Sequence, residues 1–220
     1  MIWQALRLSF LVVGIATIVI GVAGTAFGFL LAKRKFRGKD LLDALLTLPM
    51  VLPPTVTGYY LILLLGRRGL LGEPLYALTG WTVVFTWVAA VIASTVVALP
   101  LMIKSARAAI ESVDVEYEIA SCIMGKSEFE TFLRVTLPLA SRGILAGIVL
   151  SFARAFGEFG ATLMLAGNIP GRTQTMPLAI YEAVVSGEDR QAKWMALILT
   201  GISVTVIYLT NRLSRPVKRH

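Results

Sequence analysis

Residues 8–32 read LSFLVVGIATIVIGVAGTAFGFLLA, a run that contains no charged side chain. A helix needs about 20 apolar residues to cross the hydrocarbon core of a bilayer, so this run is long enough to span one. Lipid offers no hydrogen-bond partner to an exposed backbone, and the run does not alternate with the period of a barrel strand. We therefore predict a spanning helix. Gly24 and Gly28 would let another helix approach closely, either within the chain or from a second copy.

Similar runs follow along the chain, and five spanning helices are predicted, at residues 8–32, 41–65, 81–103, 143–166 and 194–213. The 220 residues are 56% hydrophobic and 15% charged, with a mean hydropathy of +0.76. This composition excludes an ordinary soluble domain. The first run is too long for the core of a signal peptide. We expect an all-α integral membrane protein with one domain over residues 1–220.

The basic residues indicate how the chain is oriented. The net charge is +8, and fourteen of the 21 Lys and Arg residues fall in three segments, at 33–39, 104–142 and 212–219. The positive-inside rule places these segments in the cytoplasm, the N-terminus outside and the C-terminus inside. Short loops cannot build the folded basic face that nucleic acid requires, so membrane lipid is the expected anionic partner and nucleic acid is not.

Histidine and cysteine are almost absent. Cys122 is the only cysteine, and the only histidine is the last residue, His220. One cysteine excludes an internal disulfide and a cysteine-cluster metal site. We predict no catalytic residue and no metal site, and expect no cofactor bound by this chain.

The second predicted span contains helix-breaking residues. Pro53 and Pro54 are followed by Thr55 and Thr57. Each proline removes a backbone donor and frees a carbonyl, which a membrane helix tolerates only against protein or a wet cavity. The segment is either a broken helix that lines a solute path or a structural kink.

The fourth predicted span contains two charged residues, Arg154 and Glu158. Four residues apart on a helix, they share one face and can neutralise each other. Charges at such depth face a protein interior or an aqueous path. The pair is either a structural lock or a gate that contacts the solute.

Residues 104–142 form the one long polar segment, and it carries a net charge of −1. A helix through this segment can dock in a partner's groove or lie against its own bundle. Apolar residues recur at helical spacing and predict one stripe along it, made of Ile110, Val113, Tyr117, Ala120 and Met124.

Within this segment, residues 118–125 read EIASCIMG and residues 135–138 read VTLP. The two pieces and their spacing resemble the EAA loop of binding-protein-dependent ABC importer permeases, with Ser121 in place of the usual second alanine and Val135 in place of isoleucine. The resemblance implies a type I ABC importer permease fold with a cytoplasmic coupling helix that docks on an ATPase. It assigns coupling roles to Glu118, Ala120, Ser121, Gly125, Leu137 and Pro138.

For two of these residues, the sequence alone also indicates a structural role. Gly125 can end the helix in a left-handed turn, and Pro138 can prevent premature continuation of the helix before the fourth span. Lys126 and Ser127 follow Gly125 as in a phosphate loop, but Ala120 stands where that loop has its first glycine. The chain itself is therefore not expected to hydrolyse ATP.

Further stretches of the sequence indicate which members of the permease family this chain resembles. Residues 157–162 (GEFGAT), 167–171 (GNIPG) and 172–181 (RTQTMPLAIY) are similar to molybdate permeases, as are 36–39 and 53–59. The resemblance implies a homodimer in the cytoplasmic membrane, cytoplasmic ABC ATPase subunits that hydrolyse ATP with Mg, and an extracytoplasmic molybdate-binding protein.

The outer segment after the fourth span offers donors that either contact the oxyanion as it leaves the binding protein, or cap a turn and contact that protein: Asn168, Arg172, Thr173 and Thr175. Permeases for tungstate or sulfate share the general plan and remain alternatives. A secondary transporter or channel without an ATPase would show paired repeats of broken helices, and only one proline-broken span is present. A structural scaffold would leave Arg154 and Glu158 unexplained.

Overall fold

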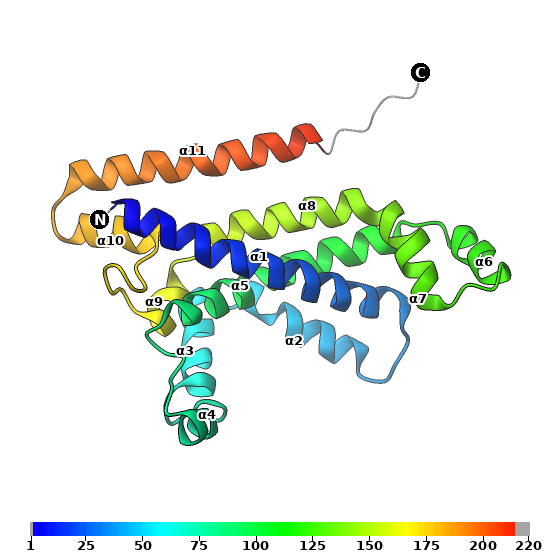
Figure 1. Ribbon diagram of the computed structural model, residues 1–220, viewed down its shortest axis with the longest axis horizontal. Coiled ribbons are helices and arrows are strands. Elements are labelled where there is room, and N and C mark those ends of the chain that lie inside the picture. Colours follow the sequence, from blue (N-terminus) through cyan, green and yellow to red (C-terminus); the bar gives the residue numbers. More distant parts are fainter. Residues whose placement is uncertain (1, 214–220) are drawn as a thin grey trace.

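The computed structural model describes residues 2–213, with side chains to residue 208. This part of the chain consists of helices joined by short loops (Figure 1). In chain order the helices are α1 (Ile2–Lys33), α2 (Lys39–Val51), α3 (Pro54–Leu65), α4 (Gly72–Thr79), α5 (Trp87–Glu111), α6 (Val115–Ile123), α7 (Glu128–Thr131), the π-helix η1 (Phe132–Thr136), α8 (Leu137–Phe156), α9 (Gly160–Ala166), α10 (Met176–Val185) and α11 (Asp189–Leu213).

The core of the molecule is the packing of α1, α5 and α8. Small residues permit it, since Gly24 and Gly28 of α1 lie directly against Met102 and Ala106 of α5. A Cβ atom at Gly28 would come within 2.8 Å of Ala106 Cβ. Of the two uses that the glycine spacing allowed, the structure shows packing within the chain.

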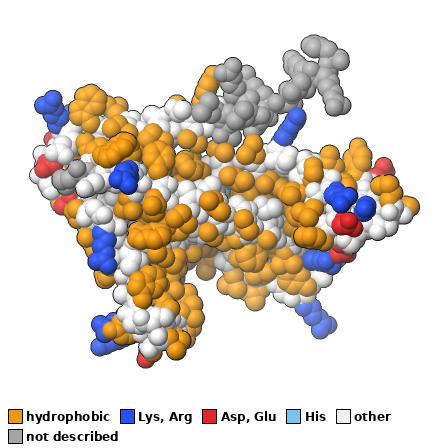
Figure 2. All heavy atoms as spheres, in the orientation of Figure 1, with side chains coloured by type: hydrophobic (Ala, Val, Ile, Leu, Met, Phe, Trp, Pro, Cys, Tyr) orange, Lys and Arg blue, Asp and Glu red, His pale blue; other side chains and the backbone are white. Residues whose placement is uncertain are grey.

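Large apolar side chains cover much of the outer surface, as Figure 2 shows for one face. Ile18 and Val22 of α1 are 69% and 70% exposed, and Leu197 and Val204 of α11 are exposed as well. A surface of this kind is stable in lipid and not in water. By length and composition four described helices can cross a membrane, and the α2–α3 pair raises the number to five if it counts as one span. The all-α membrane fold is therefore confirmed.

The second span differs most from the prediction. Residues 41–65 do not form one helix, because α2 ends at Val51, α3 begins at Pro54, and the two axes are bent by 119°. Leu52 and Pro53 adopt extended backbone conformations, and Pro54 occupies the start of α3, where its missing N–H leaves no bond unmade. α3 and α4 consequently project from the bundle (Figure 1).

The other predicted bounds also shift. The third span begins at Trp87, where the hydroxyl of Thr86 accepts a bond from Ala89 N, and it runs on to Glu111. The fourth span ends at Phe156, and α9 follows as a separate short helix. The fifth begins at Asp189. The C-terminal cations Arg215, Lys218 and Arg219, which support a cytoplasmic C-terminus, lie outside the described residues.

Candidate functional site

The short helix α6 lies at one end of the bundle, beside the end of α1 (Figure 1). Asp114 caps its start by accepting a hydrogen bond from Glu116 N at 3.0 Å. Gly125 lies just after its end with φ of +81°, a left-handed conformation that glycine adopts without strain. The turn at Gly125 is the one that the sequence predicts.

The side of α6 that faces the protein is polar. Glu118 accepts hydrogen bonds from Lys33 Nζ at 2.8 Å and from Thr136 Oγ1 at 2.6 Å. Ser121 is buried and lies 2.9 Å, Oγ to Oγ1, from Thr131. These contacts tie α6 to the end of α1 and to the α7–η1 segment, around a pocket of about 220 Å³.

The side of α6 that faces away is apolar. Val115, Ile119 and Ile123 follow one another at helical spacing and are exposed, Ile123 to 80%. Met124, just past the end of the helix, is exposed too. An exposed apolar face on a polar-anchored helix has the character of a protein-docking surface. We call Val115, Ile119, Ile123 and Met124 the docking face.

The predicted apolar stripe is therefore wrong. The chain turns at Ser112–Asp114, so Ile110 belongs to α5, and both Ile110 and Val113 are buried in the core. Tyr117 is exposed. Periodicity predicts one continuous helix here because it does not reveal a short break between two helices that each satisfy the same spacing.

The helix-stopping role expected for Pro138 is also wrong. Residues Glu128–Phe156 form one uninterrupted helical stretch, and Pro138 lies within it. The π-helix η1 immediately precedes it, where Leu137 N bonds to Phe132 O. The wider turn accommodates the ring and the missing N–H of the proline, so the helix continues instead of stopping. Leu137 packs against the core.

A second candidate site lies where the broken helices meet. A pocket of about 160 Å³ lies between the break and α5, lined by Pro49, Met50, Leu52, Pro54, Val97, Leu101 and Arg154. α9 fits against α3 closely, since a Cβ at Gly58 would lie 2.9 Å from Ala161 Cα and one at Gly160 would lie 3.0 Å from Pro54 Cβ. Thr57 is buried in this contact, while Pro53 and Thr55 are exposed.

Arg154 and Glu158 form an ion pair of 2.8 Å. Arg154 lies on α8, but Glu158 lies in the break after it and not on the same helix. The Glu158 side chain is 1% exposed, and its second oxygen accepts a hydrogen bond from Ala161 N at 2.8 Å, at the start of α9. Arg154 is 37% exposed and also lines the pocket. The pair joins α8 to α9 beside the proline break.

The loop before α10 is tightly closed. The Thr173 hydroxyl accepts a bond from Ile169 N at 3.0 Å and donates to Gly167 O, and Asn168 Nδ2 donates to Glu182 at 2.9 Å. Thr173 and Thr175 are buried, so their side chains are not free to contact an external protein in this conformation. Thr173 instead closes the turn, which is one of the roles that the sequence predicts. Arg172 remains exposed.

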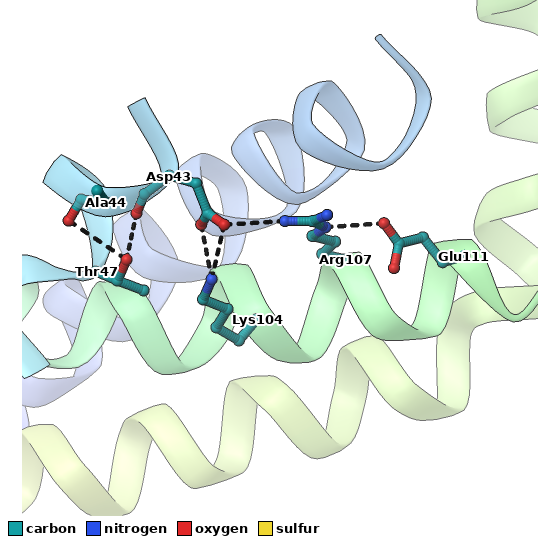
Figure 3. Close-up of polar contacts among 6 residues, drawn as sticks. All are labelled: Asp43, Ala44, Thr47, Lys104, Arg107 and Glu111. Carbon is teal, nitrogen blue, oxygen red and sulfur yellow. Dashed lines mark hydrogen bonds and ion pairs between the residues drawn. The ribbon is translucent and has the colours of Figure 1, made fainter. Parts of the chain in front are cut away.

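A network that the sequence analysis missed connects α2 to α5. Asp43 of α2 binds Lys104 and Arg107 of α5, and Arg107 also binds Glu111 (Figure 3). An acidic residue within a predicted span was the available signal, and the two cations were assigned to orientation alone.

Comparison with known proteins identifies the class. Residues 24–219 match the family of inner membrane components of binding-protein-dependent transport systems, and the chain belongs to this family. It is a non-catalytic membrane subunit of an ABC importer, which works with an ATPase and a binding protein.

The names of individual relatives are more specific than the family description. The molybdenum transport system permease protein ModB of Escherichia coli is 42% identical over 97% of this chain and 93% of its own length. The sulfate transport system permease protein CysW of Synechococcus elongatus is 35% identical over 94% of this chain and 72% of its own. A bacterial alginate ABC transporter, solved in complex with its alginate-bound periplasmic protein, shares the fold, with a TM-score of 0.77 at 15% identity, covering 96% of this chain and 77% of that one.

Proposed function

We propose that the chain imports molybdate, a tetrahedral oxyanion, across the cytoplasmic membrane by alternating access. The similarity to ModB of Escherichia coli carries the proposal, since it covers 97% of this chain at 42% identity, against 35% identity for the sulfate permease. Tungstate and sulfate are the competing solutes.

Uptake into vesicles tests the choice of solute. The chain is reconstituted with its ATPase and binding protein, and the initial uptake of labelled molybdate, tungstate and sulfate is compared with ATP enclosed. We expect saturable, ATP-dependent molybdate uptake. Sulfate uptake at a higher kcat/KM would contradict the assignment.

The docking face is the proposed contact with the ATPase. Its apolar side chains are exposed while Glu118 and Ser121 hold the helix from the opposite side. Glu118 and Ser121 thus support coupling by positioning α6, and Ala120 and Gly125 by shaping its exposed side. ATP-driven closure of two ATPases would move two such helices together and reorient the spans.

A charge placed on the docking face tests this contact. Ile123→Asp should abolish co-purification of the ATPase while the melting temperature of the chain is unchanged, because the side chain is exposed. Glu116→Gln, on the same helix, is the matched control. Retention of the ATPase by Ile123→Asp would refute the docking assignment.

The proposed assembly is a homodimer with two ATPase subunits and one external binding protein. In this arrangement α6 is cytoplasmic, which agrees with the basic residues at 33–39 beside it, and the loop with Arg172 faces outward. A second copy gives the apolar side chains of the projecting α3–α4 arm, such as Leu70 and Leu78, a surface to pack against. Cross-linking between introduced cysteines at residue 78 in membranes tests whether that arm lies at the interface.

The pocket at the proline break is the proposed solute path. It brings Pro54 and Arg154 together, and Arg154 presents a partly exposed guanidinium there. Because Glu158 neutralises the cation, the site attracts an anion without holding it strongly. The sequence leaves two alternatives for Arg154 and Glu158, a structural lock and a gate that contacts the solute. One ion pair at this position can do both.

A further inference from the structure

Two cations converge on one carboxylate in the α2–α5 network (Figure 3). Lys104 Nζ lies 2.7 and 2.9 Å from the two carboxylate oxygens of Asp43, and Arg107 Nη1 lies 3.0 Å from the second of these. Arg107 Nε also contacts Glu111 at 2.8 Å. The network has two positive and two negative groups, so it is neutral as a whole.

The network lies one helical turn along α5 from the pocket at the proline break. Leu101 and Val97 line that pocket, and Lys104 follows Leu101 by one turn on the same face of α5. From the pocket toward the end of α5 that bears α6, three cations follow one another: Arg154, Lys104 and Arg107.

α2, which supplies the carboxylate, is loosely held. None of its residues is buried, and it packs chiefly on α5. Asp43 is 21% exposed and Lys104 is 45% exposed, so the rest of the chain does not enclose the network.

We infer that Lys104 and Arg107 form a binding site for the translocated oxyanion at the inner end of its path, and that Asp43 occupies this site when the solute is absent. The inference rests on the proposed function. A carboxylate and a tetrahedral oxyanion present the same pair of oxygens to an ammonium and a guanidinium group. The solute therefore replaces Asp43 on the two cations, and the return of Asp43 releases it to the cytoplasm.

The charges explain why such a site does not trap its ligand. With Asp43 in place, the anion must displace an intramolecular competitor, which weakens its binding. A transport pathway needs sites that release as readily as they bind. Without Asp43 the two cations would hold a dianion firmly.

Inhibition by solute inside the vesicles measures this competition. Vesicles of zwitterionic lipid carry the full complex, with ATP and varied unlabelled molybdate enclosed and the binding protein with labelled molybdate outside. Asp43→Asn should lower the internal concentration that halves uptake by about tenfold or more, because one cation loses its partner. Lys104→Gln should raise it. Arg142→Gln, which removes a cation outside the network, should leave it unchanged.

The double variant Asp43→Asn/Lys104→Gln separates a solute site from a mere tie between helices. The double variant restores a net charge of zero to the network. The half-inhibiting concentration of molybdate should therefore return to within about twofold of the original value. Co-purification of the ATPase with each variant checks assembly. If the single and double variants slow uptake alike, with the half-inhibiting concentration unchanged, Asp43 only holds α2 and the inference is wrong.

Two further outcomes have distinct meanings. An anionic lipid headgroup has the same chemistry as the solute, so the series is repeated with phosphatidylglycerol in the vesicles. A shift seen only with phosphatidylglycerol would assign the site to lipid and overturn the inference. Failure of the unmodified complex to transport any oxyanion would instead refute the proposed function and, with it, the inference.

Discussion

α5 has two neighbours that it contacts in opposite ways. Against α1 it packs through glycine and alanine, with Gly24 and Gly28 in contact with Met102 and Ala106 and no room for another atom. Against α2 it makes ion pairs, and α2 buries no residue. Close packing resists displacement, because any shift loses many contacts at once. An ion pair that is partly exposed can exchange partners at little cost. The contact of α5 with α1 therefore resists rearrangement, whereas its contact with α2 can rearrange at little cost.

The largest expected effect comes from the packed side. Gly28→Leu would force α1 away from the backbone of α5, since even a Cβ there would come within 3.0 Å of Arg107 N. We expect a loss of at least about 3 kcal/mol of stability. Thermal unfolding in detergent, followed by size-exclusion chromatography, measures it. Gly14→Leu, on the same helix, is the control, because a Cβ at Gly14 has no neighbour within 4 Å. Equal behaviour of the two variants would contradict the distinction.

An intermediate effect is expected at the joint beside the proline break. Arg154→Gln leaves the buried Glu158 without its cation, although the bond from Ala161 N remains. We expect a loss of about 1–3 kcal/mol, reduced from the value for a fully buried pair by the exposure of Arg154. The double variant Arg154→Gln/Glu158→Gln should recover most of that loss.

Uptake by these variants, measured separately from assembly, distinguishes a lock from a gate. If correctly assembled Arg154→Gln transports at the normal rate, Arg154 has no part in the pathway. Slow uptake by a stable double variant would show that the charges act on the solute as well as on the helices.

The smallest effect on stability is expected at the α2–α5 contact. Asp43→Asn should cost about 1 kcal/mol or less, because both partners of the pair are partly exposed. The melting temperature of the detergent-purified chain measures it. A loss as large as that of Gly28→Leu would show that α2 is a structural element of the core and would remove the contrast between the two sides of α5.

Much of this fold follows from the sequence, and the part that does not has a physical reason. Hydropathy locates the spans because each must be apolar over about 20 residues. Pro53 and Pro54 locate the break, but its 119° bend depends on how α3 and α9 fit together at Gly58 and Gly160, which no local rule contains.

The candidate sites show the same limit. Spacing identifies Arg154 and Glu158 as partners, but it does not show that Glu158 lies beyond the end of α8. Periodicity shows which residues of α6 share a side, but the choice of the polar side as the inner one depends on Lys33 and Thr136, far away in the chain. Asp43 binds cations that lie 61 and 64 residues further along the chain.

The exposed side of α6 has a consequence for how the subunit is handled before assembly. Each large aliphatic side chain left in water costs about 1.5–3 kcal/mol relative to a buried one, and Val115, Ile119 and Ile123 present three of them together. A permease that has not met its partner therefore displays, on the side proposed to be cytoplasmic, the kind of apolar surface that chaperones and proteases bind. The helix proposed to dock on the ATPase would thereby also mark an unassembled copy, so that surplus subunits are open to removal until the complex is complete.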